Sequence, residues 1–406
     1  MKKFEIPYHY RSSFITKIKN SRKSDDPKKK NYKPTVLDFG PIRFYLARHF
    51  GFCYGVENAI DIAYRTIEEN SDKRIFLLSE MIHNPGVNAD LKKMGVRFIM
   101  DTNDKQLISW QELKSDDIVI IPAFGTTLEI EKILNEKGIN PYRFNTTCPF
   151  VEKVWNRSSS LGDNNFTVVV HGKSYHEETR ATFSHSQIKS PTIIVRDLEE
   201  TETLGDFILG LSTPNDFLKM FEGKFSNGFD VEKDFQRIGV VNQTTMLANE
   251  TQEISDYLRS IMIKKYGKEN IDEHFADTRD TLCYATNDNQ QATYGLLETN
   301  VDIAIVVGGY NSSNTGHIVE LCEKKFQTYF ISSPRDIVNL DEIRHYDVHQ
   351  KREKTTVGFM AAKEPLNIAI TSGASCPDSV VEKVIRKIIS LKKDVRNLDE
   401  VIAEVT

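Results

Sequence analysis

Cysteines are the residues whose type and spacing first suggest chemistry in this chain. The 406-residue sequence has five of them, at positions 53, 148, 283, 322 and 376. An odd number argues against a disulfide framework and leaves core packing, metal ligation or catalysis. Cys53, Cys148 and Cys283 each precede a helical pattern, and a helix N-terminus stabilises a thiolate. Three such thiolates could hold Zn²⁺ or an iron–sulfur cluster with one open iron, although core packing is the alternative for each cysteine taken singly.

Polar loops with the composition of anion sites follow three expected strands. Their sequences are Asn-Ser-Ser-Asn-Thr at 311–315, Gln-Thr-Thr at 243–245 and Ser-Gly-Ala-Ser at 372–375. Hydroxyl, amide and backbone N–H groups at a helix start suit a phosphate-like anion. Ordinary capping of the next helix is the alternative for each loop.

Histidines close to carboxylates form a third group. His83 follows one expected strand, and His171 and His176 precede Glu177 and Glu178 after another. A histidine can donate a hydrogen bond to a diphosphate, and a glutamate beside it can relay protons. The alternatives are histidines of a surface loop, or metal ligation by His171 and His176.

Short apolar runs, each followed by a polar loop and a helical pattern, must position these residues. The runs are 75–78, 118–121, 168–170, 193–195, 238–241, 303–307 and 368–370. Strands that alternate with helices predict α/β layers with parallel sheets. Ligands in such sheets collect at the carboxyl ends of the strands, where the polar loops fall.

Composition limits the class of protein. Hydrophobic residues make up 39% and charged residues 27%, with a net charge of −5, which is typical of a globular protein and does not indicate nucleic-acid binding. No apolar stretch approaches the roughly 18 residues of a membrane span, and no signal peptide is recognisable at the start. We therefore expect a cytoplasmic protein, or one of a plastid-type organelle if the source is eukaryotic.

Basic residues are concentrated near the start of the chain, at 17, 19, 22, 23 and 28–30. We interpret them as part of a mobile, solvated arm. A docking surface for an acidic protein partner is the alternative.

Taken together, the motifs resemble the 4-hydroxy-3-methylbut-2-enyl diphosphate reductase family, which catalyses the last step of the methylerythritol phosphate route to isoprenoids. The matching stretches run in the family's order, at 51–56, 82–85, 146–149, 171–182, 243–245, 283–286, 308–315 and 371–375. The N-terminal extension, the segment 122–125 and the insert around 227–237 resemble the longer cyanobacterial and plant subgroup.

The resemblance implies three α/β domains in a trefoil arrangement around a central iron–sulfur cluster. The expected boundaries are an N-terminal extension at 1–40, domains at 41–147, 148–282 and 283–395, and a C-terminal tail at 396–406. Each domain then contributes one of the three helix-start cysteines.

The resemblance also implies the reaction and the site. One [4Fe–4S] cluster is held by Cys53, Cys148 and Cys283, and its fourth iron takes the substrate's hydroxyl oxygen. Reductive dehydroxylation of (E)-4-hydroxy-3-methylbut-2-enyl diphosphate then gives isopentenyl and dimethylallyl diphosphate. Glu178 is the proton-relay carboxylate. The expected substrate-binding residues are His83, His176, Thr244, Ser312, Ser313, Asn314 and Ser375. Ferredoxin or flavodoxin is the expected electron donor of a monomer or homodimer, with no nucleic acid and no membrane involved.

Three positions depart from the family pattern. Phe124 stands where many members have a histidine, Asn289 replaces an arginine, and Cys376 replaces a threonine or alanine. We interpret Cys376 and Cys322 as packing residues. Two other functions stay open at this point, a cluster-based lyase that needs no net electrons and a non-catalytic electron carrier or redox sensor.

Overall fold

The computed structural model describes residues 4–276, 281–360 and 363–406 of the chain, and these fall into two compact units. Unit 1 takes in the described residues up to Glu57, the segment His83–Ala89, and the described residues from Tyr284 onward. Unit 2 takes in Asn58–Ile82 and Asp90–Cys283. Unit 1 is therefore built from both ends of the chain.

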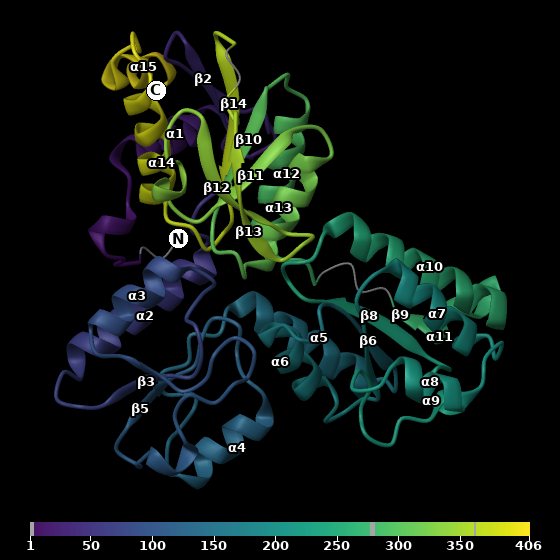
Figure 1. Ribbon diagram of the computed structural model, residues 1–406. Helices are drawn as coiled ribbons and strands as arrows, with labels where there is room; N and C mark the ends of the chain where they lie inside the picture. Colours follow the sequence, from purple (N-terminus) through teal and green to yellow (C-terminus); the bar gives the residue numbers. More distant parts are fainter. Residues whose placement is uncertain (1–3, 277–280, 361–362) are drawn as a thin grey trace. The chain divides into compact units, whose positions relative to one another are not determined.

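A mixed sheet forms the centre of unit 1 (Figure 1), and its strand order is β1-β2-β14-β10-β11-β12-β13. The strands are β1 (Thr35–Asp38), β2 (Ile42–Leu46), β10 (Ile303–Val307), β11 (Gln327–Ile331), β12 (Glu342–Asp347), β13 (Arg352–Val357) and β14 (Leu366–Ser372). Strands β2, β14, β10 and β11 are parallel, whereas β1, β12 and β13 pair antiparallel. Val307 of β10 lies opposite Ser372 of β14, so the loops after these strands begin at one edge of the sheet.

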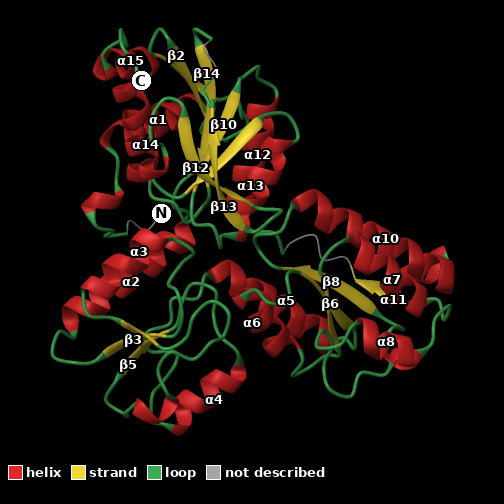
Figure 2. Ribbon diagram, in the orientation of Figure 1, coloured by secondary structure: helices red, strands yellow, loops and turns green. Residues whose placement is uncertain are grey.

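Helices flank this sheet on both sides (Figure 2). The elements are η1 (Tyr8–Tyr10), α1 (Ser13–Asp25), α12 (Tyr284–Leu297), α13 (Ser313–Glu323), η4 (Pro334–Asp336), α14 (Asp378–Leu391) and α15 (Leu398–Val405). Helices α1, α14 and α15 lie together on one side, and α12 and α13 on the other. The apolar strands are buried between the two layers and form one core with the inward faces of the helices.

Unit 2 contains a small sheet of parallel strands in the order β4-β3-β5. Its elements are β3 (Ile75–Leu77), β4 (Arg97–Phe98), η2 (Trp110–Glu112), β5 (Ile118–Ile120) and α4 (Leu128–Glu136). Helices α2 (Tyr54–Glu69) and α3 (Pro85–Lys93) have their first residues assigned to unit 1 and the remainder to unit 2.

A second parallel sheet of unit 2 has the order β7-β6-β8-β9. Its strands are β6 (Thr167–His171), β7 (Thr192–Val195), β8 (Ile238–Asn242) and β9 (Phe275–Ala276). Its helices are α5 (Pro149–Asp163), α6 (Glu177–Ser186), α7 (Leu198–Ile208), α8 (Pro214–Met220), α9 (Val231–Asp234), α10 (Ala248–Tyr266), η3 (Lys268–Asn270) and α11 (Ile271–His274). His171 of β6 lies opposite Asn242 of β8, which again starts two polar loops at one edge.

The predicted α/β class and all seven predicted strands are confirmed, and those that pair with one another do so in parallel. The three-domain trefoil and its boundaries stay predictions. Strands β1 and β2 belong to the same sheet as β14, more than 300 residues later in the sequence.

The prediction of a mobile, solvated arm is wrong for the first basic residues. Positions 13–25 form helix α1, which Ser12 caps by accepting a hydrogen bond from the backbone N–H of Ile15 at 3.1 Å. Phe14, Ile15 and Ile18 of this helix are buried in the core of unit 1. Lys17, Lys23 and the run at 28–30 are exposed to solvent, whereas Lys19 and Arg22 are half-buried.

Candidate active site

The N-terminus of α13 lies at the carboxyl edge of the unit 1 sheet, directly after β10. Ser312 is its N-cap, because Ser312 Oγ accepts hydrogen bonds from the backbone N–H of Thr315 at 3.3 Å and from Thr315 Oγ1 at 2.9 Å. The capping alternative therefore holds for Ser312.

Ser313 and Asn314, the first residues of α13, are buried but keep polar atoms without a partner. Among the described residues, neither Ser313 Oγ nor Asn314 Nδ2 has a hydrogen-bond partner. Buried polar atoms are nearly always paired, so an unpaired group needs an explanation. Two donors at the positive end of a helix fit an anionic ligand.

The peptide of Ala374 joins this helix start to Cys53. Asn314 Oδ1 accepts a hydrogen bond from the backbone N–H of Ala374 at 3.0 Å. The carbonyl oxygen of Ala374 accepts one from the backbone N–H of Cys53 at 3.2 Å. Cys53 directly precedes α2, as the sequence predicts. Unit 1 thus brings one predicted cluster ligand next to the predicted anion loop.

His83 and Ser375 also lie at this edge of unit 1. Ser375 Oγ donates a hydrogen bond to the carbonyl oxygen of His83 at 3.1 Å, and both residues are buried. A Cβ added to Gly309 would overlap that same carbonyl oxygen. Glycine at 309 therefore permits the close approach of the His83 segment to the α13 loop.

In unit 2, Glu178 and Thr244 come from the two loops that start at the shared edge of β6 and β8. The backbone N–H of Thr244 donates to Glu178 Oε1 at 2.5 Å, and Thr244 Oγ1 lies 2.9 Å from Glu178 Oε2. Glu178 is only 2% exposed. His176 caps α6, since its Nδ1 accepts from the backbone N–H of Glu178 at 3.2 Å. His176, Glu178 and Thr244 therefore form one cluster.

The neighbouring Glu177 has a different partner. Glu177 Oε1 accepts a hydrogen bond from Ser79 Oγ, in the segment that follows β3. His171 lies in β6 with its Nδ1 2.8 Å from Thr251 Oγ1. Glu178, rather than Glu177, is thus the carboxylate held against the Gln-Thr-Thr loop.

Gln243 and Asn242 support this loop, a role that the sequence analysis missed. Gln243 Oε1 accepts from the backbone N–H of Lys173 at 3.1 Å and from Thr179 Oγ1 at 2.9 Å. Asn242 Oδ1 accepts from Thr281 Oγ1 at 2.6 Å, two residues before Cys283. The sequence signal for this role is a pair of amide side chains at a strand end. They stand between an apolar run and a hydroxyl-rich loop.

Cys148 is the N-cap of α5, and its backbone N–H donates to the carbonyl oxygen of Ala123 at 3.0 Å. Phe124 follows at once, and its ring meets the His176 ring edge to face with centroids 5.8 Å apart. Phe124, which stands where the family often has a histidine, therefore packs against a predicted substrate residue instead of offering a donor.

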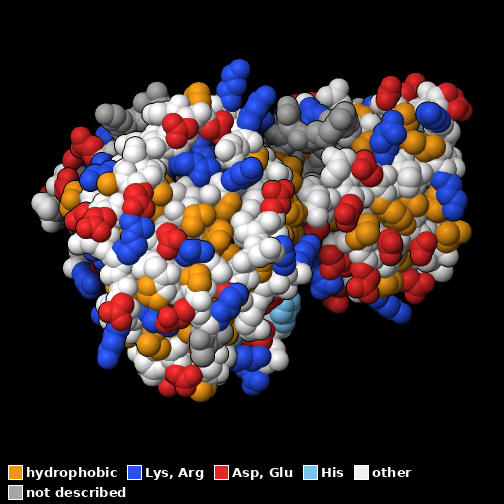
Figure 3. All heavy atoms as spheres, turned by 90° about the horizontal axis from the view of Figure 1, so that it is seen from above, with side chains coloured by type: hydrophobic (Ala, Val, Ile, Leu, Met, Phe, Trp, Pro, Cys, Tyr) orange, Lys and Arg blue, Asp and Glu red, His pale blue; other side chains and the backbone are white. Residues whose placement is uncertain are grey.

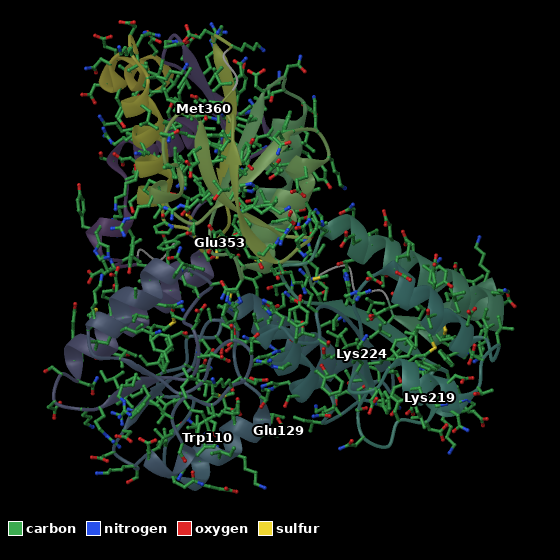
Figure 4. The ribbon with its side chains drawn as sticks, in the orientation of Figure 1. Trp110, Glu129, Lys219, Lys224, Glu353 and Met360 are labelled. Carbon is green, nitrogen blue, oxygen red and sulfur yellow. The ribbon has the colours of Figure 1, made fainter. Side chains whose placement is uncertain are left out.

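Helices α4, α5 and α6 of unit 2 are tied together near Cys148. Trp155 of α5 stacks on His185 of α6 with ring centroids 3.8 Å apart. Ser184 of α6 donates to Glu129 at the start of α4 at 2.9 Å, and Figure 4 labels Glu129. These contacts fix the helices on which Cys148 and Glu178 are placed.

The five cysteines separate into two groups. Cys53, Cys148 and Cys283 each stand directly before the first residue of a helix, namely α2, α5 and α12. Cys322 and Cys376 lie in the apolar core of unit 1, where burial raises the pKa of each thiol to about 12. The interpretation of these two as packing residues is confirmed.

The predicted site residues thus fall into two sets. Unit 1 holds Cys53, His83, Ser312, Ser313, Asn314 and Ser375, and unit 2 holds Cys148, His176, Glu178, Thr244 and Cys283. Within the described ranges, no group of three or more His, Cys, Asp or Glu side chains is placed to hold a metal ion. The three-cysteine ligand set and metal ligation by His171 and His176 stay predictions.

The sequence predicts a surface of mixed charge and no membrane span. Figure 3 shows Lys and Arg side chains interspersed with Asp and Glu over the face that it presents. In the part of the chain that the structure describes, no helix combines the length and the apolar character needed to cross a bilayer.

Comparisons with known proteins identify relatives that match most of the chain. A protein of Prochlorococcus marinus named 4-hydroxy-3-methylbut-2-enyl diphosphate reductase is 42% identical over 357 residues, which is 87% of this chain and 86% of the relative. A relative of the same name from Prochlorococcus marinus subsp. pastoris is 40% identical over 387 residues, 95% of this chain and 92% of the relative. One from a Synechococcus species is 38% identical over 386 residues, 95% and 92% of the two chains.

Two solved structures share the fold. One, described as (E)-4-hydroxy-3-methyl-but-2-enyl diphosphate reductase, the terminal enzyme of the non-mevalonate pathway, superposes with a TM-score of 0.51 at 24% identity, over 85% of this chain and 98% of that one. The other, the E-1-hydroxy-2-methyl-but-2-enyl-4-diphosphate reductase from Plasmodium falciparum, gives 0.59 at 21% identity, over 86% and 87%. The family described as "LytB protein" matches residues 44–389. With this match and relatives at about 40% identity over most of its length, the chain belongs to the LytB protein family.

Proposed function

We propose that the chain is a 4-hydroxy-3-methylbut-2-enyl diphosphate reductase. It reductively removes the hydroxyl group of (E)-4-hydroxy-3-methylbut-2-enyl diphosphate and yields isopentenyl diphosphate and dimethylallyl diphosphate. The change consumes two electrons and two protons and releases the hydroxyl group as water. The observation that carries the proposal is the start of α13, where Ser313 Oγ and Asn314 Nδ2 are buried and without partners among the described residues.

The diphosphate fits this helix start for physical reasons. Its negative charge is favoured at the N-terminus of α13, and the two unpaired donors offer hydrogen bonds that the protein itself does not satisfy. His83, Ser312 and Ser375 belong to the same edge of unit 1 and complete the proposed set there. His176 and Thr244 of unit 2 are proposed to contact the substrate as well.

The cysteines fit a [4Fe–4S] cluster by their chemistry. Thiolate ligands are favoured at helix starts, where Cys53, Cys148 and Cys283 stand, and disfavoured in an apolar core, where Cys322 and Cys376 stand. We propose the first three as the ligands of one such cluster. When bound, the cluster supplies single electrons and a Lewis acid for the substrate's hydroxyl oxygen.

Glu178 is proposed to carry the proton that leaves with the hydroxyl group. Thr244 holds both carboxylate oxygens, so the group is fixed in one orientation and shielded from water. When Glu178 Oε2 is protonated, the 2.9 Å contact runs from Glu178 to Thr244 Oγ1, and the threonine hydroxyl can then pass its own proton on. Burial keeps this path away from bulk solvent.

The test is an anaerobic assay of cluster-loaded protein with the substrate and a strong one-electron reductant. Isoprenyl diphosphate product is expected only when the reductant is present. Product without reductant would indicate the lyase class, and no product from a brown, fully loaded preparation would refute the proposal. Ferredoxin or flavodoxin as donor, the state as monomer or homodimer, the trefoil domains and the cellular location stay predictions.

A further inference from the structure

Helix α1 lies outside the part of the chain that matches the family, which begins at residue 44. Its apolar residues Phe14, Ile15 and Ile18 nevertheless enter the core of unit 1, and Lys19 follows them on the chain. The side chain of Lys19 is only 31% exposed. The Lys19 side chain therefore packs against the protein and does not extend into solvent.

Lys19 Nζ has three oxygen partners within unit 1. It donates to the carbonyl oxygen of Phe50 at 2.9 Å and to Asp378 Oδ1 and Oδ2 at 2.7 and 2.9 Å. The ammonium group also lies 4.4 Å from the centroid of the Phe50 ring. Because an ammonium group has three N–H donors, these oxygens can use its full capacity.

The two segments that Lys19 joins both carry proposed site residues. The loop 47–53, between β2 and α2, ends at Cys53. The segment 372–378, from the last residue of β14 to the first residue of α14, contains Ser375. Two further bonds connect them, from the backbone N–H of Gly51 to Ser372 Oγ at 3.1 Å and from that of Cys53 to the Ala374 carbonyl oxygen at 3.2 Å.

The two segments are in close contact, and the Asp378 carboxylate at that contact is paired with the Lys19 ammonium group. Gly51 has φ +83°, and a Cβ added there would overlap Asp378 Oδ1. The Asp378 carboxylate therefore lies directly against the backbone of the Cys53 loop. Without Lys19 this carboxylate and the Phe50 carbonyl oxygen would both lack the donor they share, in a half-buried site. A second acid, Glu57, lies one turn into α2. Burial raises its pKa, and the nearby Lys19 opposes this rise.

We propose that Lys19 is a positioning residue, which holds the Cys53 loop (47–53) against the substrate segment (372–378). The role of Cys53 as a cluster ligand rests on the proposed function, but the positioning itself does not. An exposed ion pair contributes little to stability. Lys19 differs because it bonds a main-chain carbonyl and a carboxylate from segments far apart in the sequence.

The test compares Lys19→Met, Lys19→Arg and the matched control Lys17→Met in the full chain by amide hydrogen exchange with mass spectrometry. Lys17 is exposed on the same helix and carries the same charge. Lys19→Met is expected to speed exchange in peptides covering 47–56 and 371–380 by about tenfold, through local opening. Lys17→Met is expected to leave them unchanged, and Lys19→Arg to restore most of the protection.

Peptides from strand β6 of unit 2 report on general unfolding and are expected to exchange at the rate of the unaltered chain in all variants. Unchanged exchange at 47–56 and 371–380 in Lys19→Met would overturn the inference, as would equal acceleration in Lys17→Met. This result is independent of the proposed reaction, because exchange reports local opening of the two segments, whereas failure of the reaction would appear as absence of product from the unaltered chain.

Discussion

Two neighbouring glutamates at the start of α6 have different partners, so their replacements are expected to differ. Glu178→Gln removes the proposed proton carrier and should lower turnover by at least about 100-fold while the cluster absorbance stays. Glu177→Gln should keep most activity, because an amide oxygen can still accept the hydrogen bond from Ser79. Anaerobic rates of the two variants decide the assignment. Greater loss in Glu177→Gln would reverse it.

The division of the cysteines can be tested one residue at a time. Replacing Cys53, Cys148 or Cys283 by serine should remove the visible absorbance of the reconstituted protein, since a serine hydroxyl is a poor ligand for the cluster. Cys322→Ala and Cys376→Ala should keep the absorbance and cost about 1 kcal/mol of stability through small cavities. Loss of absorbance in either alanine variant would contradict the division.

His49, in the Cys53 loop, is expected to make unit 1 sensitive to acid. Burial lowers its pKa to about 4, against the opposing effect of Asp288 on α12, and Arg48, Lys29 and Lys19 lower it further. Between about pH 6.5 and pH 4 the unfolded chain binds the proton more readily, so stability falls as the pH decreases through this window. His49→Gln should flatten that dependence, measured as urea midpoints at pH 7 and pH 5. An equal fall in both proteins would refute it.

At the scale of elements, the N-cap of α1 is expected to support the docking of this helix. Ser12→Ala removes the acceptor for the backbone N–H of Ile15 and should lower the free energy of unfolding by about 1 kcal/mol. Ser24→Ala, at an exposed position near the end of the same helix, is the control and should have little effect. Urea denaturation measures both. Equal midpoints for the two variants would mean that the cap is not needed.

The elements that could be predicted from the sequence were those with a simple hydrophobic pattern. Buried parallel strands such as β10 and β14 are continuous apolar runs, and they were found. Strands β12 and β13 were missed because they form an antiparallel hairpin whose polar and exposed residues break any such run. Helix α1 was missed because the basic residues around it outweighed three apolar ones.

The candidate site was predictable residue by residue but not contact by contact. The cysteine and loop motifs are local in sequence, and their helix-start positions follow from local pattern. The bond from Ala374 to Asn314 joins residues 60 positions apart, and the bond from Lys19 to Asp378 joins residues 359 positions apart. Such pairings depend on the sheet order, in which β14 lies between β2 and β10, and no local pattern specifies that order.

At the scale of the whole molecule, the described N-terminal residues belong to unit 1, and their removal is expected to destabilise it. A chain that starts at residue 44, where the family match begins, would lose Phe14, Ile15, Ile18 and strand β1. We expect its free energy of unfolding to fall by several kcal/mol, on the order of 1.5–3 kcal/mol for each large side chain removed, so that it unfolds at a lower urea concentration. It should also bind the dye ANS through the uncovered apolar surface. A midpoint equal to that of the full chain would refute this.

The sheet of unit 1 also sets an order of events during synthesis on the ribosome. Strand β2 is made early, but its neighbour β14 and the Ala374 carbonyl that holds Cys53 emerge more than 300 residues later. Unit 2 is complete in sequence before that point and can fold first, since domains generally fold as units during translation. The Cys53 loop can reach its final position only when the C-terminal part has been made. Cofactor delivery to Cys53 is therefore expected to follow the synthesis of β14 and Ala374.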